Sequence, residues 1–254
     1  MKLHVETLGS GPDLVLVHGW SIHGEVCHGL AERLAERMRV HVPDLPGHGR
    51  SRGAPLPDLP RLAADLAELF PTPTHLCGWS LGAQVAMRWA IDRPHQVARL
   101  ALIAATPRFA AGPDWNAGSA LGDLEAFADA LHADYRGTLE RFIALQAMGS
   151  PAPKKVLARF RRRLAHAAAP DPDALDAGLR ILTETDLRSE VARLEQCTLI
   201  LHGERDAVVP QAAGEWLARA LPRGRLMVIP EAGHAPFVSH EAECARALSE
   251  HFHG

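Results

Sequence analysis

Short apolar runs alternate with amphipathic segments along most of the chain, and this alternation limits the fold more than any other feature. The runs are rich in Val, Leu and Ile and are not broken by regularly spaced polar residues, which is typical of strands buried on both faces. The segments between them repeat apolar residues at three- and four-residue spacing, as amphipathic helices do. The pattern predicts an α/β fold with a mainly parallel central sheet. Strands are expected at 14–19, 40–45, 75–80, 100–105, 197–203 and 226–230, a candidate antiparallel edge strand at 5–11, and helices at 29–38, 62–70 and 82–93.

The alternation stops between residues 107 and 187, where helical patterns follow one another without a convincing strand. A helical block inserted between two strand-bearing parts is expected to cover the carboxyl edge of the sheet, where open α/β sheets bind ligands. We therefore predict a core of residues 1–106 and 188–254 and an inserted helical cap, or lid, of residues 107–187. The helices of the cap are expected at about 119–132, 137–148, 154–168 and 173–185.

The predicted cap carries a local excess of basic residues. Residues 136–163 contain eight Lys and Arg side chains against one acid, Glu140, a net charge of +7 in a chain whose formal net charge is −3. A partner with an acidic surface would meet this segment first. The alternative is a solvated helix face that binds nothing. The small net charge of the whole chain argues against a protein that binds nucleic acid or a membrane surface over its length.

The sequence contains no recognisable motif for a membrane span, a signal peptide or a metal site. No run of residues approaches the roughly 18 apolar residues of a membrane-spanning helix, and the N-terminus has no long apolar signal-peptide region. We therefore expect a soluble, cytoplasmic protein, and a monomer because no interface motif is present. The four cysteines are widely spread, and neither HExxH nor a zinc-type Cys/His cluster occurs. Reduced thiols, no metal and no other cofactor are expected.

The stretch 78–82, Gly-Trp-Ser-Leu-Gly, has the form G-x-S-x-G and falls between a predicted strand and a predicted helix. Such a strand-to-helix turn exposes the serine hydroxyl, here that of Ser80, and its glycines let neighbouring backbone pass close by. The turn also places the backbone N–H of Leu81 at a helix N-terminus, where partial positive charge favours a developing oxyanion. This context makes Ser80 a candidate nucleophile.

A serine hydroxyl needs a histidine to accept its proton and a carboxylate to orient that histidine. In the arrangement typical of G-x-S-x-G turns, the acid and then the histidine follow the serine along the chain. Asp206 lies just past one predicted strand and His234 in the loop after the last one. Glu204 is the alternative acid and His240 the alternative base, whereas His202 precedes the acid and is in the wrong order. Asp206 and His234 are therefore the predicted partners of the serine.

A second Gly-Trp-Ser, at 19–21, follows the first long apolar run and lacks the G-x-S-x-G pattern. In this kind of fold the second oxyanion donor comes from the loop after that early strand. The backbone N–H of Trp20 is therefore predicted to act with that of Leu81, a donor worth on the order of 10²–10³ in rate. The indole ring can also wall a substrate pocket. The alternative is a loop tryptophan packed only for stability.

Six segments together resemble the pimeloyl-[acyl-carrier protein] methyl ester carboxylesterases of biotin synthesis, a family of α/β-hydrolases. The resemblance runs over nearly the whole chain and is weakest around 55–75 and 150–175. It implies hydrolysis of the methyl ester of pimeloyl-acyl carrier protein, with release of methanol. The most specific segments are RFIALQAMG and AGHAPFVSH, and the others are LVLVHGWSIHGEV, VPDLPGHGRSRG, GWSLG and GERDAVVP.

The resemblance also implies roles for individual residues. Ser80 would be the nucleophile, Asp206 the orienting acid, and His234 the general base and later acid, with Trp20 and Leu81 as oxyanion donors. The predicted substrate-binding residues are these, apart from Asp206, together with Phe142, Ile143, Ala144, Leu145 and Gln146. The predicted contacts to an acidic acyl carrier protein are Arg141, Lys154, Lys155 and Arg159. A glycine, Gly137, stands where the family would have a basic residue.

Other functions fit the same scaffold. A general short-chain carboxylesterase is the main alternative, and a perhydrolase or a C–C bond hydrolase is also compatible with it. Epoxide hydrolases and haloalkane dehalogenases, which resemble this fold, carry Asp in place of Ser80 and are excluded. A ligand receptor built on this scaffold is the non-enzyme alternative, although the intact Ser80, Asp206 and His234 argue against it.

Overall fold

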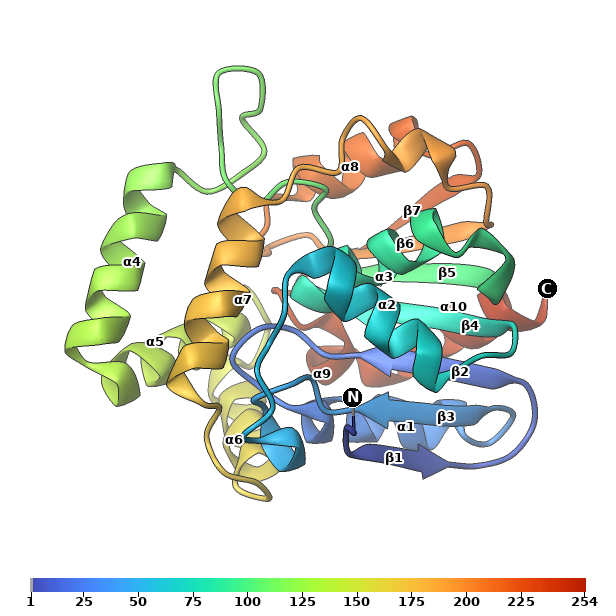
Figure 1. The fold of residues 1–254 in the computed structure, drawn as a ribbon, viewed down its shortest axis with the longest axis horizontal. Helices are drawn as coiled ribbons and strands as arrows, with labels where there is room; N and C mark the ends of the chain where they lie inside the picture. Colours follow the sequence, from blue (N-terminus) through green and yellow to red (C-terminus); the bar gives the residue numbers. More distant parts are fainter. Residues whose placement is uncertain (1) are drawn as a thin grey trace.

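The computed structural model describes residues 2–254, which form one seven-stranded sheet with helices on both faces (Figure 1). The strand order is β1-β3-β2-β4-β5-β6-β7. Only β1 runs antiparallel, pairing with β3 from Val5 opposite Pro43, and the other strands are parallel. The predicted α/β class with a mainly parallel sheet is confirmed. The strands are β1 Val5–Leu8, β2 Asp13–Val17, β3 Arg39–Pro43, β4 Thr74–Trp79, β5 Val97–Ile103, β6 Thr198–Gly203 and β7 Gly224–Ile229.

The central strands are apolar throughout because helices cover both faces of the sheet. Alternate residues of β2 belong to different buried clusters: Val15 and Val17 pack into one, and Leu14 and Leu16 into the other. The first cluster includes residues of α2 (Leu59–Leu69), α3 (Leu81–Asp92) and α8 (Gln211–Ala220). The second includes residues of α1 (His28–Leu34), α9 (Pro236–Ser239) and α10 (Glu241–His253). The helices α8, α9 and α10 were not predicted from the sequence.

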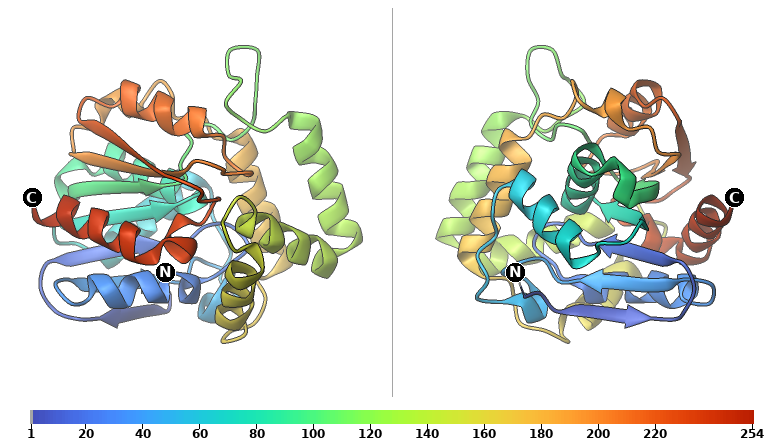
Figure 2. Two further views of the ribbon diagram at one scale, coloured as in Figure 1. Left: turned by 180° about the vertical axis from the view of Figure 1, so that it is seen from behind. Right: turned by 45° about the vertical axis from the view of Figure 1, so that its right-hand side comes forward.

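Four further helices lie between β5 and β6 in the chain, where only helices were expected. They gather at one end of the sheet, beyond the carboxyl ends of the parallel strands (Figures 1 and 2). We refer to them as the four-helix segment. It consists of α4 Leu121–Ala133, α5 Tyr135–Ala147, α6 Pro153–Leu164 and α7 Pro172–Glu184.

Within residues 2–254, no helix has the length and apolar character needed to cross a membrane.

Candidate active site

Ser80 occupies a strained turn between β4 and α3. Its backbone has φ 56° and ψ −117°, a conformation that a serine adopts only when the surrounding structure holds it there. The two glycines of the motif have no room for side chains. A Cβ on Gly78 would lie 2.1 Å from the carbonyl oxygen of Gly82, and one on Gly82 would lie 2.3 Å from that of Val17. The spacing of the G-x-S-x-G pattern therefore follows from close backbone contacts around Ser80.

Ser80, His234 and Asp206 form one chain of hydrogen bonds, although 154 residues separate Ser80 from His234. The His234 Nε2 lies 3.0 Å from the Ser80 Oγ. On the other side of the ring, Nδ1 lies 2.8 Å from Asp206 Oδ2 and 3.0 Å from Oδ1. Because a carboxylate only accepts, Nδ1 carries the proton, and Nε2 is free to accept the proton of the serine hydroxyl. The side chains of His234 and Asp206 are almost completely buried.

The loop after β6 holds the Asp206 carboxylate in place. Its Oδ1 accepts hydrogen bonds from the backbone N–H groups of Val208 and Val209, at 2.8 and 2.9 Å. Burial opposes ionisation of Asp206, but the charge and hydrogen bond of His234 and the neighbouring donors outweigh it and lower the pKa of the carboxyl group. Asp206 is therefore ionised at neutral pH.

His202, which sequence order ruled out as the base, lies beside the same carboxylate. Its Nε2–H donates to the carbonyl of Val209 at 3.0 Å and lies 3.6 Å from Asp206 Oδ2. Burial lowers the pKa of His202, so the ring is neutral. It therefore does not form an ion pair with Asp206. Glu204 and His240 lie outside the chain of hydrogen bonds: Glu204 accepts from the N–H of Glu231 on the surface, and His240 contacts Ser239.

The two predicted oxyanion donors belong to segments that adjoin Ser80. Leu81 is the first residue of α3, and the first N–H groups of a helix have no partner within the helix. Gly19 packs against the serine, since a Cβ on Gly19 would lie 3.3 Å from the Ser80 Cβ, and Trp20 is the next residue. His18 fixes this loop: its Nδ1–H donates to the Gly19 carbonyl at 2.8 Å.

The opposite nitrogen of His18 accepts from the N–H of Leu45 at 2.9 Å, so one buried ring joins the loop after β2 to the loop after β3. The sequence interpretation missed this residue. Its position directly before Gly19, at the end of an apolar strand, is the signal that could have identified it.

A large cavity of about 680 Å³ lies between the four-helix segment and the loops after β2, β5 and β6. A much tighter space beside Ser80 is lined by Trp20, Phe142 and Gln146, and the first two also line the large cavity. The rings of Trp20, Phe127 and Phe142 meet there with centroids 5.1–5.6 Å apart. The indole N–H of Trp20 donates to the carbonyl of Leu175 at 2.9 Å, which fixes the ring as a wall.

Not every residue of the predicted substrate-binding run 142–146 faces this space. Phe142 and Leu145 line the large cavity, and Gln146 lines the space beside Ser80. Ile143 instead lines a different hollow and packs into the second buried cluster, and Ala144 is not among the lining residues of either space near Ser80. A consecutive run on a helix cannot line one cavity, because successive side chains point about 100° apart.

Several cavity residues were not predicted from the sequence. They come from α4, α7 and the loops after β5 and β6. The spacing of apolar residues in the two helices shows that each helix has an apolar face, but it does not show which residues of that face line the cavity. They are Phe109, Leu124, Phe127, Leu179, Leu182 and Val208.

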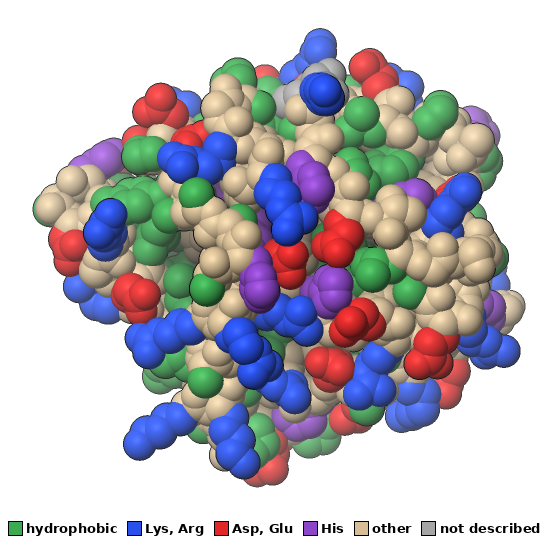
Figure 3. Space-filling model, turned by 90° about the horizontal axis from the view of Figure 1, so that it is seen from below, with side chains coloured by type: hydrophobic (Ala, Val, Ile, Leu, Met, Phe, Trp, Pro, Cys, Tyr) green, Lys and Arg blue, Asp and Glu red, His purple; other side chains and the backbone are tan. Residues whose placement is uncertain are grey.

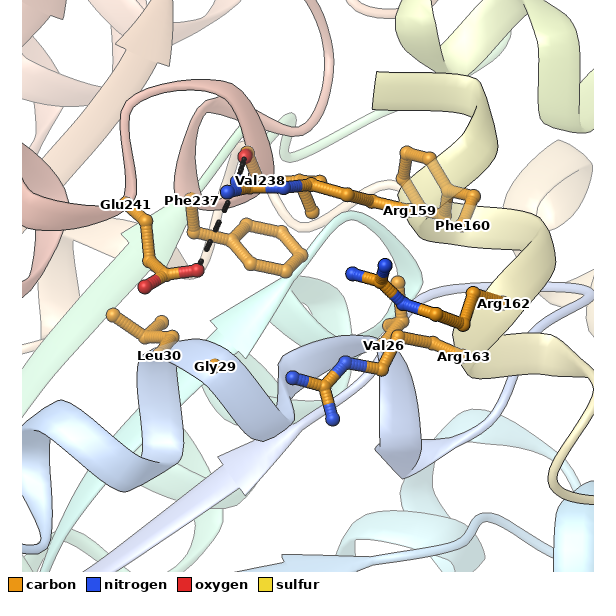
Figure 4. A pocket seen from close by; sticks show the side chains of 10 residues that line it. All are labelled: Val26, Gly29, Leu30, Arg159, Phe160, Arg162, Arg163, Phe237, Val238 and Glu241. Carbon is orange, nitrogen blue, oxygen red and sulfur yellow. Dashed lines mark hydrogen bonds and ion pairs between the residues drawn. The ribbon is translucent and has the colours of Figure 1, made fainter. Parts of the chain in front are cut away.

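The predicted carrier-binding residues lie on α5 and α6. Arg141 lines the large cavity, and its guanidinium donates to Thr138 Oγ1 at 2.7 Å. Lys154 and Lys155 are exposed at the start of α6. Arg159 donates to the carbonyl of Val238 at 2.8 Å and lines a small pocket with Arg162 and Arg163 (Figure 4). Basic side chains with few acids between them gather on the lower left of the face seen from below (Figure 3).

The site brings together a hydroxyl, an imidazole whose Nε2 can accept its proton, and a buried carboxylate. Nucleophilic attack on an acyl group is the reaction that such a set performs. Among the described residues, no group of three or more His, Cys, Asp or Glu side chains is arranged to hold a metal ion.

Comparison with known proteins places this geometry in a family. Residues 14–247 match the family described as "Alpha/beta hydrolase family". The chain belongs to the alpha/beta hydrolase family. The predicted fold, with its mainly parallel sheet, is thereby confirmed at the level of the family as well as of the class.

Two relatives of this alpha/beta hydrolase cover almost its whole length. The first, from Nitrosomonas europaea, is 44% identical over 238 residues, which is 94% of each chain. The second, from Chromobacterium violaceum, is 44% identical over 252 residues, covering 99% of this chain and 98% of its own. Both are named pimeloyl-[acyl-carrier protein] methyl ester esterase.

Solved structures with the same fold include two esterases. The esterase EaEST from Exiguobacterium antarcticum superposes with a TM-score of 0.89 at 24% identity, covering 99% of this chain and 96% of its own. A thermophilic esterase from Thermogutta terrifontis gives a TM-score of 0.83 at 26% identity, covering 98% and 92%. The whole chain, including the four-helix segment, therefore follows a known alpha/beta hydrolase arrangement.

Proposed function

We propose that the protein is a serine carboxylesterase that hydrolyses the methyl ester of pimeloyl-acyl carrier protein, giving pimeloyl-acyl carrier protein and methanol in biotin synthesis. The chain of hydrogen bonds from Ser80 through His234 to Asp206, with a large apolar cavity adjoining the space beside Ser80, is the observation that carries the proposal. The name shared by relatives that are 44% identical over almost the whole chain supports the choice of ester. The protein is thus a carboxylic ester hydrolase.

In the first half of the reaction, Ser80 Oγ attacks the ester carbonyl while His234 Nε2 accepts its proton. The N–H groups of Trp20 and Leu81 stabilise the negative charge that develops on the carbonyl oxygen. His234 then gives the proton to the departing methoxy group, so methanol leaves and an acyl-serine remains. Asp206 keeps the ring in the tautomer that accepts at Nε2 and stabilises the imidazolium that forms.

In the second half, a water molecule attacks the acyl-serine carbonyl while His234 accepts one of its protons. The proton returns to Ser80 Oγ as the acyl–oxygen bond breaks. The free carboxylic acid is released and the enzyme regains its starting state. Each proton transfer in the two halves therefore passes through His234 Nε2.

The four-helix segment suits an acyl chain joined to a carrier. We assign residues 107–187 to a cap over a core of residues 1–106 and 188–254. Phe142 and Leu145 give the large cavity apolar walls that match methylene groups, and Gln146 places an amide beside the reacting ester. Arg141 at this cavity would lie close to the carrier end of the substrate.

An acidic carrier protein would dock on the basic surface of α5 and α6. Besides Arg141, the proposed contacts are Lys154, Lys155 and Arg159 on α6, and Arg159 lies beside Arg162 and Arg163 (Figure 4). Most of these side chains are exposed, so the attraction would act mainly on the rate of encounter and be weakened by salt. The enzyme would act as a monomer in the cytoplasm, with neither nucleic acid nor a membrane as partner.

Mass spectrometry of the methyl ester of pimeloyl-acyl carrier protein, incubated with the purified protein, tests this function. We expect loss of one methyl group, and no loss with Ser80→Ala. A short-chain p-nitrophenyl ester serves as the control substrate. Hydrolysis of the control by Ser80 without demethylation of the carrier-bound ester would contradict the proposed substrate and favour a general short-chain carboxylesterase.

A receptor without turnover is the remaining candidate, and a fluorophosphonate probe separates it from an enzyme. Labelling of Ser80, lost in His234→Ala, is expected of an activated serine. A folded protein whose Ser80 stays unlabelled would contradict the esterase proposal.

A further inference from the structure

A second large hollow, of about 540 Å³, lies between α5 and α6. It shares no lining residue with the large cavity or with the space beside Ser80. Its walls are apolar, with Leu139 and Ile143 on α5, Leu164 on α6, and alanines from the connection between α6 and α7. We call this space the α5–α6 hollow.

Helix α5 separates the α5–α6 hollow from the large cavity. Phe142 and Leu145 face the large cavity, whereas Leu139 and Ile143 face the hollow. Residues of the loop after β2 also face different spaces. Trp20 lines the large cavity and the space beside Ser80, whereas Ser21 and His23 line the hollow. The hollow is therefore a separate compartment and not an extension of the proposed acyl site.

The inner end of the α5–α6 hollow carries two buried polar side chains, each with one unpartnered atom. Ser21 and His23 are 2% and 1% exposed, and within the described chain neither Ser21 Oγ nor His23 Nδ1 has a hydrogen-bond partner. His23 Nε2 carries the proton, because it donates to the carbonyl of Leu164 at 3.4 Å. Nδ1 is then an acceptor, and a buried group left unpaired costs about 1–3 kcal/mol. A donor arriving in the hollow would recover part of that cost.

The rim of the α5–α6 hollow is positively charged. Arg161 pairs with Glu140, with Nη2 2.9 Å from Oε2. Arg136 is exposed and has no ion-pair partner among residues 2–254. The rim therefore offers one uncompensated guanidinium to an anion, above apolar walls and a polar inner end.

We propose that the α5–α6 hollow binds a medium-chain aliphatic carboxylate with a hydroxyl group near its far end. The carboxylate pairs with Arg136, the chain lies against Leu139, Ile143 and Leu164, and the hydroxyl reaches toward Ser21 and His23. From Arg136 to Ile143 the wall formed by α5 rises about 10 Å, close to the length of an extended chain of eight to ten carbons.

A ligand in this hollow would adjoin the loop that supplies one of the proposed oxyanion donors. Ser21 has a left-handed backbone, with φ 68°, and directly follows Trp20. The binding proposal itself does not depend on what Ser80 does.

Isothermal titration of the protein with 10-hydroxydecanoate tests the proposal, after an alkyl fluorophosphonate has reacted with Ser80 and filled the large cavity. We expect one saturable site. Leu164→Trp, which fills the hollow, should weaken binding at least about tenfold. Arg136→Ala should weaken it about three- to tenfold, and should leave the binding of uncharged decane-1,10-diol unchanged.

Matched variants and a second filling variant make the result decisive. Leu121→Trp on an exposed face of α4 and Arg246→Ala on α10 should bind as the parent protein does. Ala168→Phe provides a second way to fill the hollow if Leu164→Trp fails to fold. Absence of saturable binding to the phosphonylated protein, or unchanged binding in both filling variants, would overturn the proposal. A Ser80 that does not react would count against the esterase function alone, since the filling variants still report on the hollow in unlabelled protein.

Discussion

Trp79 donates its indole N–H to the backbone carbonyl of His234 at 2.9 Å, joining two residues 155 positions apart in the chain. Trp79 is the last residue of β4, next to Ser80, so this bond ties the serine turn to the loop that carries the proposed base. Its ring also packs against Phe237, with centroids 4.9 Å apart. The distance between Ser80 and His234 therefore depends on a buried tryptophan as well as on the two residues themselves.

Trp79→Phe should lower kcat by about ten- to a hundredfold, because the loop of His234 loses its tether and the imidazole is less well placed. The lost hydrogen bond should also lower the free energy of unfolding by about 1 kcal/mol or more. Trp89→Phe is the matched control, since the buried indole nitrogen of Trp89 has no partner within residues 2–254. Ester hydrolysis and denaturant unfolding of both variants are the measurements. Equal loss of kcat in the two would contradict the tether.

Asp206→Asn should lower kcat by about 10⁴-fold, because an amide can hold His234 in the tautomer that has a proton on Nε2. Substrate affinity should change little, since Asp206 does not line either space near Ser80. Glu204→Gln tests the alternative acid and should stay active. Steady-state kinetics of both variants would identify the acid, and an inactive Glu204→Gln beside an active Asp206→Asn would reverse the assignment.

Stability should fall as the pH is lowered from about 6.5 to about 4. Burial lowers the pKa of His48 from 6.5 to about 4 and that of His18 to about 3. In this range the unfolded chain binds protons that the folded chain does not, so acid favours unfolding by at most about 1.4 kcal/mol per pH unit for each histidine. His48→Asn should flatten the dependence, whereas the same change at exposed His95 should not. Urea unfolding between pH 4.5 and 7 measures it, and an unchanged slope in His48→Asn would contradict the prediction.

Gln146→Leu should raise stability and lower activity together. The Gln146 side chain is 3% exposed, and its amide oxygen has no hydrogen-bond partner in the described chain. Removing it should stabilise the protein by about 1 kcal/mol, yet kcat/KM for the methyl ester should fall about tenfold because the amide lines the space beside Ser80. Gln196→Leu removes another unpartnered amide oxygen, just before β6, and should leave kcat/KM unchanged. Unfolding and kinetics of the two variants decide whether this glutamine serves the substrate or only packing.

Salt should weaken turnover of the carrier-bound ester steeply and turnover of a small neutral ester hardly at all. The reason is that attraction between the basic helices and an acidic carrier is screened over about 8 Å at physiological ionic strength. Replacing Lys154 and Lys155 together by Ala should reduce the salt dependence for the carrier substrate only. Measurement of kcat/KM for both substrates over a range of salt concentrations tests this, and equal salt sensitivity would count against carrier docking.

Local sequence patterns were enough to predict every strand of the sheet and the residue types in the site. This is because buried parallel strands are apolar on both faces, whereas helices repeat at 3.6 residues. The turn around Ser80 was also predictable, because the two glycines are required by backbone contacts within a few residues of it or with the adjacent strand. The order of acid and base along the chain excluded His202 but left Glu204 and His240 as alternatives to Asp206 and His234, and the structure decided between them.

Which side chains meet one another depends on the tertiary structure. Sequence spacing could not show that α5 has a cavity on each side, so Ile143 was predicted beside the substrate although it faces the α5–α6 hollow. It could not place His202 3.6 Å from Asp206, or bring the Trp79 indole to the His234 carbonyl. Periodicity fixes the faces of a helix or strand only relative to its own axis. The neighbour that covers each face is settled by packing between elements far apart in the chain.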